Sequence, residues 1–88
     1  MKLIIAVLRD SDNELVSQGL VSKGFRVTRI ASTGGFLRRG SSTLVVGVED
    51  TEVDHAIDTI RNNLGPVTEP GINRANLFVL NIEHFHQI

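Results

Sequence analysis

The sequence predicts an α+β fold with the element order βαββαβ. Four short segments rich in apolar residues have the length of strands, at 2–8, 25–31, 43–48 and 77–82. Two stretches between them carry apolar residues at helical spacing, and the clearer one contains Val53, Ala56, Ile57, Ile60 and Leu64. This order is the ferredoxin-like pattern, a four-stranded antiparallel sheet with two helices on one face. At this length we expect a single domain over residues 1–88.

The first half of the chain supplies a strand, a helix and a second strand. The run Leu3 to Leu8 is wholly apolar and predicts the first strand. Ser11 and Glu14 have the spacing of a capping box, which predicts that a helix begins there. Gly24 has the position of a glycine just beyond a helix, so the second strand is expected to follow it at once.

The second half repeats the arrangement after the third strand. Thr51 with Asp54 predicts a helix start, and Gly65-Pro66 predicts its end after Leu64. A turn-rich connection over 67–76 leads to the last strand, and residues 83–88 form a tail with two histidines.

Three of the predicted strands do not alternate between apolar and polar residues, at 3–8, 44–46 and 77–80. A sheet covered on one face should alternate, because its other face meets water. Both faces of these strands therefore require burial, whereas two helices cover only one face. Another subunit is the simplest cover for the second face, so the pattern favours an oligomer.

Composition excludes several classes of protein. The chain has no cysteine, which removes disulfides and cysteine-based chemistry. Its longest apolar run is too short for a membrane helix and has no signal-peptide cleavage site, so a cytoplasmic protein without a membrane partner is expected. The formal net charge is −1, but residues 15–48 contain five cations and no acidic residue. This asymmetry argues against general nucleic-acid binding. It fits either a local site for a small anion or two oppositely charged solvated faces.

A long connection between the second and third strands is the best candidate for a binding site. It carries Gly34, Gly35, Phe36, Arg38 and Arg39, whereas a simple hairpin needs only two to five polar residues. Glycine lets backbone N–H groups approach a ligand, arginine forks onto phosphate, and an aromatic ring offers a stacking face. The same composition also suits a solvated loop.

The strand before this connection adds two candidate ligand contacts. Arg26 and Thr28 are two residues apart, so they project from the same side of an extended strand. A surface arginine and threonine on an edge strand would give the same pattern. No nucleophile–base pair or phosphate-loop motif is present, so no enzyme activity is expected. His84 and His86 are too few for a structural zinc site, and we expect no metal and no cofactor.

The sequence resembles the PII-like cyclic-di-AMP receptor proteins, which are small bacterial trimers related to the PII nitrogen-signalling proteins. The resemblance rests on MKLIIAVLRDSD at the start, on KGFRVTRIASTGGFLRRGSSTLVVGVED, and on the final FHQI. The segment ASTGGFLR at 31–38 is specific for that family. The resemblance implies a ferredoxin-like homotrimer that binds cyclic-di-AMP between subunits, changes loop conformation and signals to an unknown protein target.

The resemblance also implies a set of ligand-binding residues: Arg26, Thr28, Gly35, Phe36, Leu37, Ser41, Gly47, Phe78 and Gln87. In that set Phe36 and Leu37 would sandwich an adenine, and Arg26 would meet a phosphate. The family usually has asparagine at the position of Ser41, and its connection before the last strand is longer than 65–76. The first departure predicts weaker binding and the second an altered signal output. A trimer that binds another adenine nucleotide, or none, and acts through protein contacts is the alternative.

Overall fold

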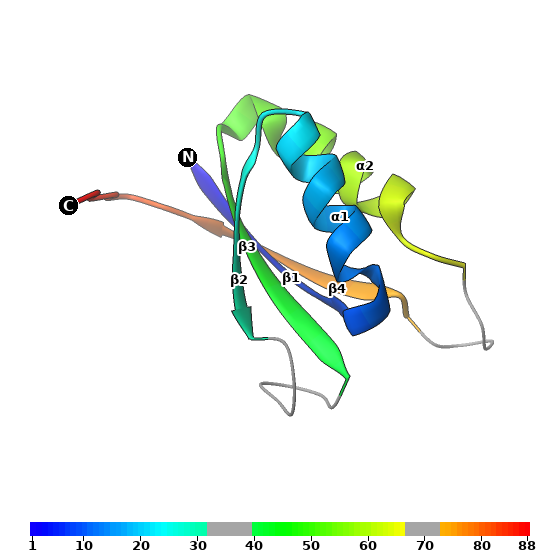
Figure 1. Ribbon diagram of the computed structural model, residues 1–88. Coiled ribbons are helices and arrows are strands. Elements are labelled where there is room, and N and C mark those ends of the chain that lie inside the picture. The colour runs from blue at the N-terminus through cyan, green and yellow to red at the C-terminus, as the bar shows by residue number, and fades with distance from the viewer. Residues whose placement is uncertain (32–39, 67–72) are drawn as a thin grey trace.

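The computed structural model describes residues 1–31, 40–66 and 73–88. Its elements follow the predicted order (Figure 1). They are β1 (Lys2–Arg9), α1 (Asp10–Ser22), β2 (Arg26–Ala31), β3 (Ser41–Val48), the short 3₁₀ turn η1 (Asp50–Glu52), α2 (Val53–Asn63) and β4 (Ala75–Asn81).

The four strands form one sheet in the order β2-β3-β1-β4, and each neighbouring pair is antiparallel. The two helices lie side by side on one face of this sheet (Figure 1). The arrangement confirms the predicted ferredoxin-like fold. It places β1 and β3 at the centre, so these two strands carry most of the sheet's packing.

The core lies between the sheet and the helices. Alternate residues of β1 (Ile4, Ala6 and Leu8) are buried there, together with alternate residues of β3 and one side of each helix. The remaining core members are Val16, Leu20, Leu44, Val46, Val48, Ala56 and Ile60. Each large apolar side chain buried in this way stabilises the fold by about 1.5–3 kcal/mol relative to exposure.

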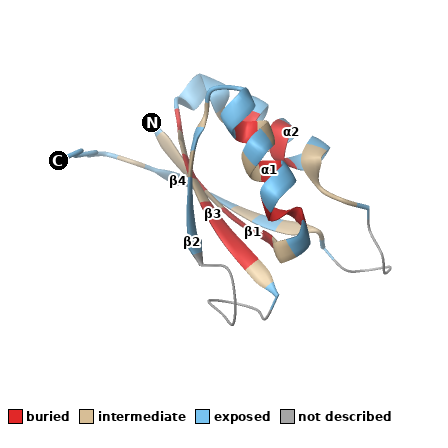
Figure 2. Ribbon diagram, viewed as in Figure 1, coloured by how far each residue is buried: buried red, intermediate tan, exposed pale blue. Residues whose placement is uncertain are grey.

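We call the face of the sheet away from the helices the open face (Figure 2). Ile5 of β1 lies between Val45 of β3 and Phe78 of β4, and all three project from this face. Ile5 and Val45 are half-buried, whereas Phe78 is 49% exposed. The three predicted runs at 3–8, 44–46 and 77–80 therefore each place apolar side chains on this face as well as on the helix side.

The predicted starts of both helices are wrong by one or two residues. The first helix has Arg9 as its N-cap, so Ser11 lies inside its first turn and does not cap it. The second helix follows η1, whose Glu52 N–H donates to the Glu49 carbonyl at 2.9 Å. Because this turn incorporates Thr51, the N-cap position falls on Glu52. The strands β3 and β4 each begin two residues earlier than predicted, since the pairing with β1 continues to Arg9 for β3 and to Leu8 for β4.

A polar cluster at the junction of β1 and α1 holds the ends of two connections. The Arg9 guanidinium donates to the Asp12 carboxylate (Nε to Oδ2, 2.8 Å) and to the Pro66 carbonyl (3.1 Å). The other oxygen of Asp12 accepts from the Gly65 N–H at 3.0 Å. The Asp10 N–H donates to the Gly40 carbonyl at 2.8 Å. The junction therefore fixes the chain immediately after residues 32–39 and immediately before residues 67–72.

We predict that Asp12→Ala lowers the free energy of unfolding by about 1–3 kcal/mol, because it leaves Nε of the partly buried Arg9 and the Gly65 N–H without their acceptor. Asp58→Ala is the matched control, since Asp58 also pairs with an arginine three residues away at 3.0 Å. The Asp12 side chain is 7% exposed and that of Asp58 is 61% exposed. The control should therefore cost about 0.5 kcal/mol or less. Urea unfolding measures both values, and equal losses would contradict the role of the junction.

Candidate functional site

A cavity of about 410 Å³ opens on the open face, beside β2 and the chain ends. The register of the strands determines which residues form the floor of the cavity. Arg26 lies opposite Gly47, and Gly47 lies opposite Leu3 on the next strand. Thr28 lies opposite Val45 in the same way. Directly paired residues of antiparallel strands project from the same face, so these five residues lie together. The remaining lining residues are Met1, Ile82, Phe85 and Gln87.

The side chains that line the cavity combine one positive charge with neutral polar groups and an apolar surface. Arg26 supplies the guanidinium, Thr28 a hydroxyl and Gln87 an amide. None of the described lining residues is acidic. An arginine beside a hydroxyl can bind a phosphate group, and the apolar surface from Leu3, Val45 and their neighbours can accept a flat ring. The arrangement therefore suits an anionic ligand that carries an aromatic group.

Gly47 keeps the floor of the cavity open. A Cβ atom at this position would lie 3.2 Å from the methyl group of Met1. A side chain here would require the end of the exposed Met1 side chain to shift by a few tenths of an ångström, whereas glycine leaves the backbone of β3 accessible from the cavity.

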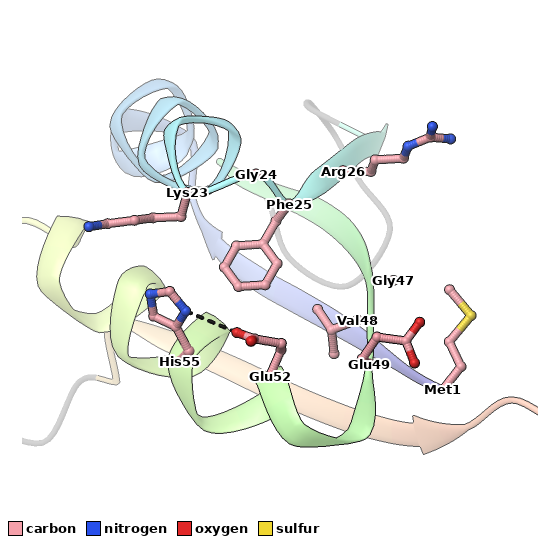
Figure 3. A pocket seen from close by; sticks show the side chains of 10 residues that line it. All are labelled: Met1, Lys23, Gly24, Phe25, Arg26, Gly47, Val48, Glu49, Glu52 and His55. Carbon is pink, nitrogen blue, oxygen red and sulfur yellow. Dashed lines mark hydrogen bonds and ion pairs between the residues drawn. The ribbon is translucent and has the colours of Figure 1, made fainter.

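A second cavity of about 380 Å³ lies around the end of the sheet, on the helix side (Figure 3). It shares Met1, Arg26 and Gly47 with the first cavity, but Glu49 and Glu52 also line it. The rings of Phe25 and His55 meet edge to face with centroids 5.4 Å apart, and His55 Nδ1 lies 3.1 Å from Glu52. Figure 3 shows the Arg26 side chain directed away from Phe25 and His55. Its two carboxylates are balanced by two cationic side chains, Lys23 and Arg26, so this cavity lacks the excess of positive charge that the first cavity offers to an anion.

A salt bridge joins the N-terminus to the turn that follows β3. The N-terminal ammonium of Met1 lies 2.9 Å from the Asp50 carboxylate. Its hydrogen bond is the main cause that lowers the pKa of Asp50 below the ordinary value, and its positive charge acts in the same direction. The pair holds Met1 beside Gly47, where Met1 lines both cavities.

The structure brings four of the nine sequence-predicted binding residues together. Arg26, Thr28, Gly47 and Gln87 line the open-face cavity. Phe78 lies on the same face, but β1 separates it from β3 and it does not line the cavity. Ser41 begins β3, four residues from Val45 and about 13 Å away along the strand. Gly35, Phe36 and Leu37 lie outside the described residues.

Five lining residues were missed by the sequence interpretation: Met1, Leu3, Val45, Ile82 and Phe85. A signal existed for three of them. Leu3 and Val45 belong to the apolar residues that break the alternation of their strands. Phe85 is two residues before Gln87, so an extended tail directs both side chains to the same side.

The described residues 1–31, 40–66 and 73–88 contain no cluster of three or more His, Asp or Glu side chains that could hold a metal ion. No helix among them is long and apolar enough to cross a membrane.

Comparison with known proteins identifies a family and solved structures with a similar fold. Residues 1–69 match the family model of the cyclic-di-AMP receptor, which confirms the resemblance seen in the sequence. The fold is similar to that of a functionally unknown protein from Pediococcus pentosaceus ATCC 25745, with a TM-score of 0.79. The match covers 99% of this chain and 96% of that chain at 26% sequence identity.

Proposed function

The chain belongs to the cyclic-di-AMP receptor family, and on that premise we propose that it binds cyclic-di-AMP on the open face and signals by protein contact rather than by catalysis. The observation that carries the proposal is the meeting of Arg26, Thr28, Gly47 and Gln87 around one cavity. These residues come from three separate parts of the chain, and the sequence interpretation had assigned all four to the ligand.

Each of these residues has chemistry that a cyclic dinucleotide requires. Arg26 can donate two hydrogen bonds to phosphate oxygens, and Thr28 can bind a phosphate or a ribose hydroxyl. The Gln87 amide carries a donor and an acceptor, which matches the donor and acceptor on the edge of adenine. Gly47 permits close approach of the ligand to the backbone of β3.

The site is proposed to be shared between two subunits. Arg26 begins β2, whereas the connection 32–39 starts after Ala31 at the other end of that strand, about 17 Å away. Its far end, Gly40, is held at the same distant end by Asp10. A site that contains both Arg26 and the loop residues Gly35, Phe36 and Leu37 is therefore assembled most simply from the strand of one subunit and the loop of its neighbour. Ser41 and Phe78 belong to this proposed inter-subunit site.

The oligomer is proposed to be a homotrimer in which neighbouring subunits cover the open faces. Phe78 and Leu80 are each about half exposed there, and Leu3, Ile5 and Val45 are half-buried. Burial of these side chains would favour association, because each square ångström of apolar surface removed from water contributes about 25 cal/mol. Ligand bound between subunits could then change the conformation of the loops, which would alter contact with a protein target.

We predict that cyclic-di-AMP binds more tightly than cyclic-di-GMP or ATP, and that Arg26→Ala weakens this binding by about 1.5–3 kcal/mol, the range for a hydrogen bond to a charged group. Arg29→Ala is the matched control on the same strand. Arg29 faces α1, where it lies 3.8 Å from Glu14, so its loss should change affinity less than about twofold. Calorimetric titration measures all of these affinities. Equal affinity for the three nucleotides, or no binding, would favour the alternative of a trimer that acts without this ligand.

We predict that the protein has the mass of three 9.6 kDa chains in light scattering coupled to gel filtration. Leu80→Glu should dissociate it, because the charge would have to be buried without a partner between subunits. Leu15→Glu is the control, since Leu15 is an equally apolar exposed residue on α1, away from the open face. A monomeric wild type, or a Leu80→Glu variant that keeps its mass, would contradict the proposed assembly.

A further inference from the structure

The C-terminal tail carries an aromatic side chain into the open-face cavity. Phe85 lines the cavity and is 63% exposed, so one large part of its ring has no cover within the described chain. The start of the tail is fixed, because the Ile82 N–H donates to the Met1 carbonyl at 3.0 Å. The tail therefore leaves the sheet beside the N-terminal end of β1, where Leu3, Gly47 and Arg26 meet (Figure 1).

The cavity beside this ring has the composition of a site for a planar base. Its floor is formed by Gly47, Val45 and Leu3, which contribute no charge and, at Gly47, no side chain. Phe85 and Ile82 add apolar surface from the tail, and Gln87 adds an amide two residues further on. An aromatic ring near an apolar floor and a hydrogen-bonding amide is the combination by which proteins stack a base and contact its edge.

A cyclic dinucleotide has two bases, whereas the sequence interpretation supplies stacking residues for only one of them, at Phe36 and Leu37. We propose that Phe85 stacks on the second base and that Gln87 contacts the edge of the same base. This inference rests on the proposed function. It makes the C-terminal tail a part of the ligand site that determines specificity for a base, separate from the phosphate contact at Arg26.

The neighbouring residues of the tail provide a matched control. Phe85 and Gln87 line the cavity, whereas His84 and His86 do not. This alternation is the behaviour of an extended segment, in which successive side chains project to opposite sides. A change at His86 therefore alters the tail without altering the proposed contact.

Fluorescence gives a direct test, because the chain contains no tryptophan and no tyrosine. A single tryptophan in Phe85→Trp reports only on position 85 and can still stack on a base. Saturating cyclic-di-AMP should strongly quench its emission, whereas His86→Trp should show little quenching. Equal quenching in the two variants, or none in Phe85→Trp while calorimetry shows binding, would overturn the inference.

Calorimetric titration distinguishes a Phe85 ring that stacks on a base from a Phe85 side chain that only shields apolar surface of the cavity from water. Phe85→Ala should weaken cyclic-di-AMP binding about 5- to 150-fold, the range for loss of one stacked base, and Phe85→Leu should weaken it nearly as much. Phe85→Trp should retain binding, and light scattering should give all variants the mass of the wild type. Wild-type affinity in Phe85→Ala or Phe85→Leu would overturn the inference and leave the proposed function standing. No binding by the wild type would overturn both.

Discussion

The central constraint on this structure is that β1 is apolar on both faces and is flanked on the open face by Val45 and Phe78, while the helices cover only the other face. Ile4, Ala6 and Leu8 face α1 and α2 and are buried, and this packing holds the sheet together. Leu3 and Ile5 alternate with them on the same strand and face away from the helices. The second apolar face results from this unbroken apolar run in β1, and it provides the surface beside which the candidate site lies.

The edge strand β2 shows how this constraint separates two similar side chains. Arg29 projects toward the helices and lies near Glu14 of α1, so it contributes to the packing of that layer. Arg26 projects from the open face, where the described lining of the cavity contains no carboxylate. An edge strand can carry both arginines because one side of it borders solvent. The two residues thus differ in function because they lie on opposite faces, although their local sequences are alike.

The polar junction and the cavity occupy opposite ends of the sheet. Arg9, Asp10 and Asp12 hold the chain next to the two connections, at the end where β1 meets α1. The cavity lies at the other end, beside Met1, Gly47 and Ile82. A rigid sheet of paired strands joins these ends within one chain. This separation is the physical reason for proposing that the strand of one subunit and the loop of another form the site together.

Local patterns in the sequence determined the order of the elements, the apolar character of both sheet faces and the shared side of Arg26 and Thr28. Each of these features depends on the spacing of residues within a single helix or strand, and that spacing can be read directly from the sequence. Only the tertiary structure decided that Gly47 and Leu3 lie beside Arg26, that the tail with Phe85 and Gln87 lies at the same cavity as Arg26, and that Asp12 holds Gly65. These contacts depend on strand register and on pairs such as Asp12 and Gly65, 53 residues apart. Strand register is set by how the apolar faces pack across the whole sheet, so a pattern within one strand does not identify which residue of the next strand lies opposite.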